Sequence, residues 1–280
     1  MSVVDTRSPS GNAVFNLLAG TIQRIPPVVW FEWRRAFTVS RMAWMLSLMA
    51  FPPGLLLLVQ MAARNDPRVE VISILIFILC ACVVCMMSVF LWATPVLSSE
   101  LEGRSWVYLA VRPYGPMAVL IGKYIVAVSW AIPVGLVSAT LSVFVFPTEE
   151  PAHLIAVHGG LVLLSCLAYS ALFLLIGVIA PKKCMVAGII YTIIFEVAFA
   201  MIPAAVNMLT VQYRLRCLLI RWMEFDKALA ERNPVFLSYF GDESSAWHVG
   251  VLLGMTLGYL IAAGIILRYR EFTAAIETES

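Results

Sequence analysis

Residues 71–97 read VISILIFILCACVVCMMSVFLWATPVL and contain no charged side chain. A membrane-spanning helix needs about 20 consecutive, mainly apolar residues, so this run is long enough to cross a bilayer. The whole chain has the same character, with 61% hydrophobic residues, 13% charged residues and a mean hydropathy of +0.91. Soluble domains average about 25% charged residues. The composition therefore predicts an all-α, polytopic integral membrane protein.

The apolar runs on either side of 71–97 predict a bundle of six membrane spans within a single domain, 1–280. The bundle covers 42–267, preceded by a cytoplasmic or interfacial segment, 1–41, and followed by a cytoplasmic tail, 268–280. Pro52-Pro53-Gly54 should kink the first span, because proline removes a helix hydrogen bond. The predicted spans are 42–62, 71–97, 124–146, 154–180, 184–206 and 247–267.

Two further helices are expected outside the spans. The elbow Trp33-Arg34-Arg35 predicts a helix in the headgroup layer, with aromatic rings toward lipid and guanidinium groups toward water. The alternative is that it is the solvated start of the first span. Between spans five and six, 207–232 is predicted to be helical and extracytoplasmic, within an outer loop, 207–245. Whether this helix gates an exit or only seals the bundle stays open.

The distribution of Lys and Arg predicts the orientation, because cytoplasmic loops carry an excess of both. With the N-terminus inside, the short outer loops hold only Arg64 and Arg68, and all twelve other basic residues outside the long last loop fall inside. Both termini are then cytoplasmic, in the cell (inner) membrane. The formal net charge is only +2, without acidic or basic blocks, so no nucleic-acid partner is expected.

One polar stretch interrupts the apolar chain directly after the second span. Residues 98–113 read SSELEGRSWVYLAVRP, and Gly122-Lys123 follows shortly before the third predicted span. An acidic patch, a glycine, a hydrophobic helix, an Arg-Pro turn and then Gly-Lys resemble the pattern of ABC-2 type transporter permeases. The elbow before the first span, the six spans, a Glu in the fifth and the helical outer loop fit the same family, so the resemblance covers nearly the whole chain.

The resemblance implies that 98–113 is a cytoplasmic coupling helix that docks on a separate ATP-binding subunit. It also implies an exporter whose pathway is completed by a second permease copy or a paralogue. The plain alternative for 98–113 is a solvated loop, and the alternative function is a stand-alone channel or secondary transporter. The residues expected to couple to the ATPase are Glu100, Glu102, Gly103, Arg104, Trp106, Arg112 and Pro113.

The chain itself lacks the sequence of an ATP-hydrolysing enzyme. A phosphate-cradling loop requires Gly, four residues, then Gly-Lys-Ser/Thr. Gly115 and Gly122-Lys123 are separated by too many residues, and Tyr124 follows. No cofactor is therefore expected on this chain, and ATP and Mg²⁺ are expected on the partner.

Glu196 is the one Asp, Glu, Lys or Arg side chain within a predicted span, where burying a carboxylate costs several kcal/mol. It could contact a proton or substrate, or hold the fifth span by a hydrogen bond, and the sequence favours neither. Cys82, Cys85 and Met86 share a helix face and could hold Cu(I), but ordinary packing is the favoured interpretation. The substrate cannot be read from the sequence.

His153 and His158 point to different helix faces, which makes a poor ligand pair. Glu149-Glu150 lies beside them, but the other motifs of an intramembrane hydrolase are missing. The six cysteines are interpreted as packing residues rather than as a disulfide framework: Cys80, Cys82, Cys85, Cys166, Cys184 and Cys217.

Overall fold

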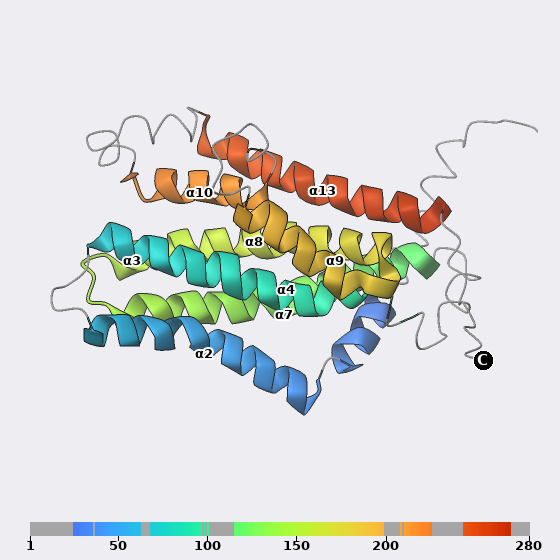
Figure 1. Cartoon of the computed structure of the whole chain (residues 1–280), viewed down its shortest axis with the longest axis horizontal. Helices are drawn as coiled ribbons and strands as arrows, with labels where there is room; N and C mark the ends of the chain where they lie inside the picture. Colours follow the sequence, from blue (N-terminus) through green and yellow to red (C-terminus); the bar gives the residue numbers. More distant parts are fainter. Residues whose placement is uncertain are drawn as a thin grey trace, which may run out of the picture.

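The computed structural model of the chain is a bundle of long helices with a shorter helix at one end (Figure 1). No strand occurs among the residues it describes, which agrees with the predicted all-α class. Five of the helices are long and apolar enough to cross a membrane. The described residues are 25–35, 37–62, 68–96, 98, 100, 115–198, 208, 210–225 and 243–269.

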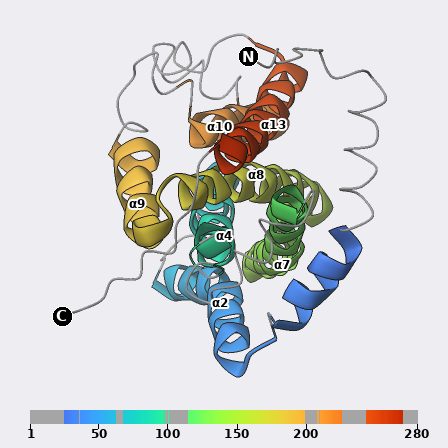
Figure 2. The same cartoon turned by 90° about the vertical axis from the view of Figure 1, so that its right-hand side faces the viewer.

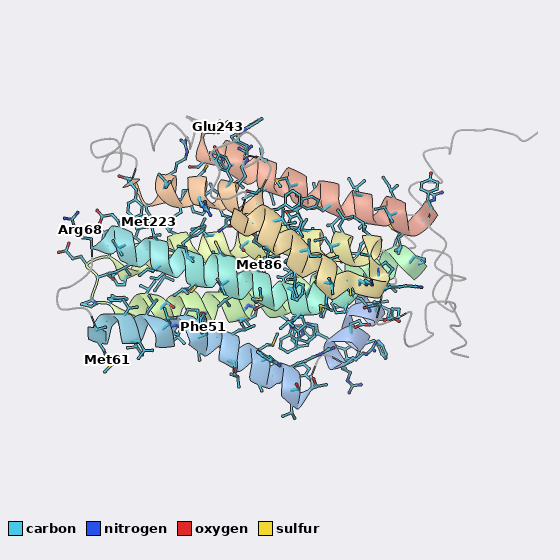
Figure 3. The ribbon with its side chains drawn as sticks, in the orientation of Figure 1. Phe51, Met61, Arg68, Met86, Met223 and Glu243 are labelled. Atoms are coloured by element: carbon cyan, nitrogen blue, oxygen red, sulfur yellow. The ribbon has the colours of Figure 1, made fainter. Side chains whose placement is uncertain are left out.

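The first two crossings show what proline and tight packing do to a long helix. α2 (Val39–Ala62) continues through Pro52 and Pro53 and changes direction part-way along, near the labelled Phe51, as the prolines predict (Figures 1 and 3). The second crossing consists of α3 (Val69–Ile76), the π-helical η1 (Phe77–Val84), α4 (Cys85–Ala93) and the 3₁₀ turn η2 (Thr94–Val96).

The next two crossings are uninterrupted helices, α7 (Gly115–Val145) and α8 (Pro151–Ile179). α7 begins well before the predicted residue 124. Lys123, which directly precedes the predicted start, is buried within the helix beside an acid.

The last part of the chain returns before it crosses again. η3 (Pro181–Lys183) leads into α9 (Cys184–Tyr191) and the π-helical η4 (Thr192–Ala198); α10 (Val211–Trp222) and α13 (Ser245–Tyr269) follow. α8 and α13 run in the same direction, so the chain comes back between them (Figure 1). α9 with η4 occupies one half of the bundle length and α10 the other. The fifth predicted span, 184–206, is described only to Ala198.

α8 is the central helix. It contacts α4 and α7 on one side and α10 and α13 on the other, and its side chains are the most buried of the five long helices (Figure 2). Small residues let neighbours approach closely, as membrane helices require: a Cβ on Gly135 of α7 would lie 2.7 Å from Val162 and 2.8 Å from Cys85. α2 and α13 expose most of their apolar side chains, as expected of helices that face lipid.

The Gly115 end of the bundle holds the start of α7 and the ends of α8 and α13, and helix 25–35 lies there (Figure 1). The Arg68 end carries Met61 and Arg68, both labelled in Figure 3.

Candidate functional site

Four charged side chains form a compact ionic cluster at the Gly115 end. Lys123 Nζ donates to Glu100 Oε1 at 2.7 Å and lies 3.7 Å from Glu32 Oε1. Arg35 Nη1 is 3.6 Å from Glu100 Oε1 and 3.9 Å from Glu32 Oε1. The side chains of Glu100 and Lys123 are only 7% and 8% exposed, whereas Arg35 is half exposed. The cluster therefore joins helix 25–35, the residues after α4, and α7.

Helix 25–35 can reach α7 because Gly122 has no side chain. A Cβ at Gly122 would lie 2.7 Å from Val28 Cγ1. The helix is described from Ile25, and Pro26 and Pro27 follow directly. Gly122 thus provides the contact surface and Lys123 the ion pair, which gives the Gly-Lys dipeptide a physical purpose.

An aromatic stack holds the same helix to the bundle. Trp33 Nε1 donates to Ser129 Oγ at 2.8 Å, and its ring stacks on Trp130 with centroids 4.9 Å apart. Trp130 stacks on Trp92 of α4 at 5.7 Å, and the Arg41 guanidinium of α2 lies 4.6 Å from the Trp92 centroid. Helix 25–35 is therefore fixed to α2, α4 and α7 by rings as well as by charges.

The structure describes part of the predicted coupling and elbow residues. In the elbow, Trp33 packs on α7, whereas Arg34 is exposed beside the Trp30 ring and Arg35 joins the ionic cluster. Among the predicted ATPase contacts, Glu100 is described and buried. Those outside the described residues are Glu102, Gly103, Arg104, Trp106, Arg112 and Pro113.

A second polar group surrounds Glu196 inside the bundle. Tyr169 Oη of α8 donates to Glu196 Oε2 at 2.8 Å, and Tyr191 Oη of α9 donates to Oε1 at 3.2 Å. The Gln212 amide of α10 lies against the main-chain carbonyl of Glu196. With its NH₂ group turned to that carbonyl, its oxygen accepts from Arg216 Nη2 at 3.1 Å. We call Tyr169, Tyr191, Glu196 and Gln212 the Glu196 cluster.

This cluster lies about midway along the bundle. Met86, labelled in Figure 3, is near mid-length, and Thr192 Oγ1 of η4 is 4.0 Å from its sulfur. η1 approaches from the other side, because Cys82 Sγ lies 3.5 Å from the Gln212 amide. Both η1 and η4 are π-helical, and π segments inside helices often mark functional sites.

The sulfur-rich face of the second crossing is divided among three neighbours. Cys80 contacts Ser138 and Ser142 of α7, Cys82 contacts Gln212 of α10, and Cys85 packs beside Cys166 of α8. The part of the chain that the structure describes contains no group of three or more His, Cys, Asp or Glu side chains placed to hold a metal ion. All six cysteines are buried thiols. Packing accounts for these positions.

His158 points into the bundle, where its Nε2 lies 3.1 Å from Ser73 Oγ. The sequence suggests His158 only as a poor ligand partner for His153. In the structure it joins α8 to α3 as an interhelical hydrogen-bonding group.

Sequence reasoning did not place several residues of these sites. Lys123 was noted within the Gly-Lys pattern but not as the partner of Glu100. Tyr169, Gln212 and Arg216 carry no local motif; Tyr169 precedes Glu196 by 27 positions. A search for tyrosines in the apolar runs would have nominated Tyr169 as a candidate partner for a buried acid, whereas Gln212 and Arg216 lie outside those runs.

No protein-family model, curated protein sequence or solved structure matches this chain.

Proposed function

We propose that the chain is the permease subunit of an ATP-binding cassette exporter in the cell membrane. In this proposal both termini face the cytoplasm, and 98–113 docks on a separate ATP-binding subunit that holds ATP and Mg²⁺. A second permease copy or a paralogue completes the pathway. The support is the sequence resemblance to ABC-2 type permeases, together with the way Glu100 is held.

The ionic cluster is the observation that carries the proposal. Glu100 lies at the start of the 98–113 segment, and its carboxylate contacts both Lys123 of α7 and Arg35 of helix 25–35. A segment tied to a bundle through a buried ion pair cannot move without moving its partners. Force applied to 98–113 would therefore reach α7 directly and α4 through the adjoining chain.

The hypothesised mechanism is alternating access. ATP binding on the partner subunits would push 98–113 toward the membrane, and the ionic cluster and the Trp33–Trp130–Trp92 stack would transmit the displacement to α2, α4 and α7. Hydrolysis would reset the helices. Coupling of this kind requires a contiguous, stiff set of contacts with two arrangements, and the ionic cluster and the stack supply the contacts.

Co-purification from the native membrane tests the proposal. The intact chain should co-purify with a polypeptide that hydrolyses ATP. Reversing the charge of Glu102, which lies in the proposed docking segment, should reduce that recovery. Glu149→Lys is the matched control, because Glu149 is exposed at the opposite end of the bundle. If reconstituted chain transports a solute without any ATPase, it is a stand-alone channel or secondary transporter, and the permease proposal is wrong.

A further inference from the structure

We propose that the Glu196 cluster is the binding site for a hydrophobic organic cation, which would be the cargo; its identification as cargo rests on the proposed permease function. The site combines a buried carboxylate with the aromatic rings that stack on its two tyrosine partners. Together these two features favour a positive charge on an otherwise apolar molecule.

The carboxylate provides the charge. Glu196 is 2% exposed, and its two oxygens accept hydrogen bonds from Tyr169 and Tyr191. Phenol groups stabilise a carboxylate but do not neutralise it. The nearby guanidinium of Arg216 provides the opposite charge, and the Gln212 amide joins it to the main-chain carbonyl of Glu196. Arg216 is thus the resident cation of the site.

The rings provide the apolar surface. The Tyr191 ring stacks on Phe195 with centroids 5.0 Å apart, and the Tyr169 ring stacks on Phe173 at 6.1 Å. Phe173 in turn meets Phe90 of α4 edge-on at 5.4 Å. Aromatic faces attract cations, and rings arranged around a site are the usual way in which proteins recognise quaternary ammonium groups.

Arg216 and Gln212 both belong to α10, so a movement of α10 away from η4 would remove the resident cation. The carboxylate would then need another positive charge. A hydrophobic cation fits this requirement, since its charge replaces that of Arg216 and its apolar groups contact the rings. An anion of the same shape would meet the carboxylate and should be rejected.

Tetraphenylphosphonium and tetraphenylborate form a matched pair of probes, because they share size and shape and differ in the sign of their charge. Their binding to the full chain in nanodiscs is measured by equilibrium dialysis, with empty nanodiscs as the background. We expect the wild-type chain to bind the cation at least 10-fold more tightly than the anion. Glu196→Gln should abolish this preference, and Arg216→Gln should tighten cation binding several-fold by removing the competitor.

If the Glu196 cluster had only a structural role, Glu196→Gln and Arg216→Gln would not change cation binding in opposite directions. Glu149→Gln makes the same chemical change as Glu196→Gln on an exposed residue and should leave both affinities unchanged. Equal affinity for both probes in the wild type, or undiminished cation binding in a monodisperse Glu196→Gln chain, would overturn the proposal. If that variant does not fold, the wild-type comparison and Arg216→Gln decide.

The outcome is independent of the ATPase, because the chain is tested without a partner. If the chain binds the cation selectively but does not co-purify with an ATPase, the site proposal stands and the permease proposal is wrong. If it co-purifies with an ATPase but shows no preference for the cation, the permease proposal stands and the site proposal is wrong.

Discussion

The ionic cluster and the Glu196 cluster each contain one buried glutamate, but they stabilise its carboxylate with different kinds of partner. Glu100 is paired with a lysine at 2.7 Å and with a half-exposed arginine at 3.6 Å. The Glu196 carboxylate accepts two phenol hydrogen bonds, and the Gln212 amide lies between the guanidinium of Arg216 and the main-chain carbonyl of Glu196. Charged partners are tolerated near the end of the bundle, where Arg35 remains exposed to solvent. Midway along the bundle, neutral donors contact the carboxylate directly.

This difference suggests different roles. A tight ion pair between separate segments fixes their relative position, which suits the transmission of force. An acid held by neutral donors retains its charge for another cation. Substitutions that remove one partner at a time can distinguish an ion pair that fixes two segments from a carboxylate that can exchange its cation.

The largest effect is expected for Lys123→Met. Removing the lysine leaves the carboxylates of Glu100 and Glu32 together and largely buried, and breaking a buried pair in this way costs about 3–5 kcal/mol. Unfolding of the purified chain in mixed micelles by increasing SDS measures the loss. Adding Glu100→Gln should restore a large part of the stability. A Lys123→Met chain as stable as the wild type would show that Glu100 is not held by this pair.

A smaller effect is expected for Tyr169→Phe. The substitution keeps the ring stacked on Phe173 but removes one hydrogen bond to a buried carboxylate, which corresponds to about 1.5–3 kcal/mol. Tyr191→Phe is the comparison, and its longer hydrogen bond of 3.2 Å predicts a smaller loss. The same SDS titration ranks the two variants. The reverse order would mean that Tyr191, not Tyr169, is the main support of Glu196.

The sequence was most informative where a single side chain differs from its surroundings. An uninterrupted apolar run predicts a long helix, and Pro52-Pro53 predicts the bend in α2, because each effect is local. Glu196 stood out for the same reason. The partners of the acids could not be predicted, since Lys123 and Tyr169 meet them only after distant segments pack. The start of α7 was misplaced because the burial of Lys123 depends on Glu100.

Gly122→Leu tests whether shape as well as charge holds helix 25–35. The added side chain would overlap Val28, whose Cγ1 and Cβ lie 2.7 Å and 3.3 Å from the position of the new Cβ. Because a β-branched side chain is stiff, helix 25–35 itself must shift, and we expect a loss of about 1–3 kcal/mol. Tryptophan fluorescence should report the displacement of Trp33 from Trp130. Gly54→Leu is the matched control, because nothing lies within 4 Å of a Cβ at that position. If the two variants gave the same fluorescence spectrum, we would conclude that the ion pairs alone hold helix 25–35 to α7.

Arg35→Met should have the smallest effect on stability, under about 1 kcal/mol, because the arginine is half exposed and its contacts with Glu100 and Glu32 are long. Its contribution should also decline as salt increases, unlike that of the buried Lys123. SDS titrations of both variants at low and high salt measure this contrast. If Arg35→Met destabilises the chain as much as Lys123→Met, the cluster acts as one buried network. If it does not, the exposed half of Arg35 remains available to a partner carboxylate, and its loss should then weaken ATPase recovery without unfolding the chain.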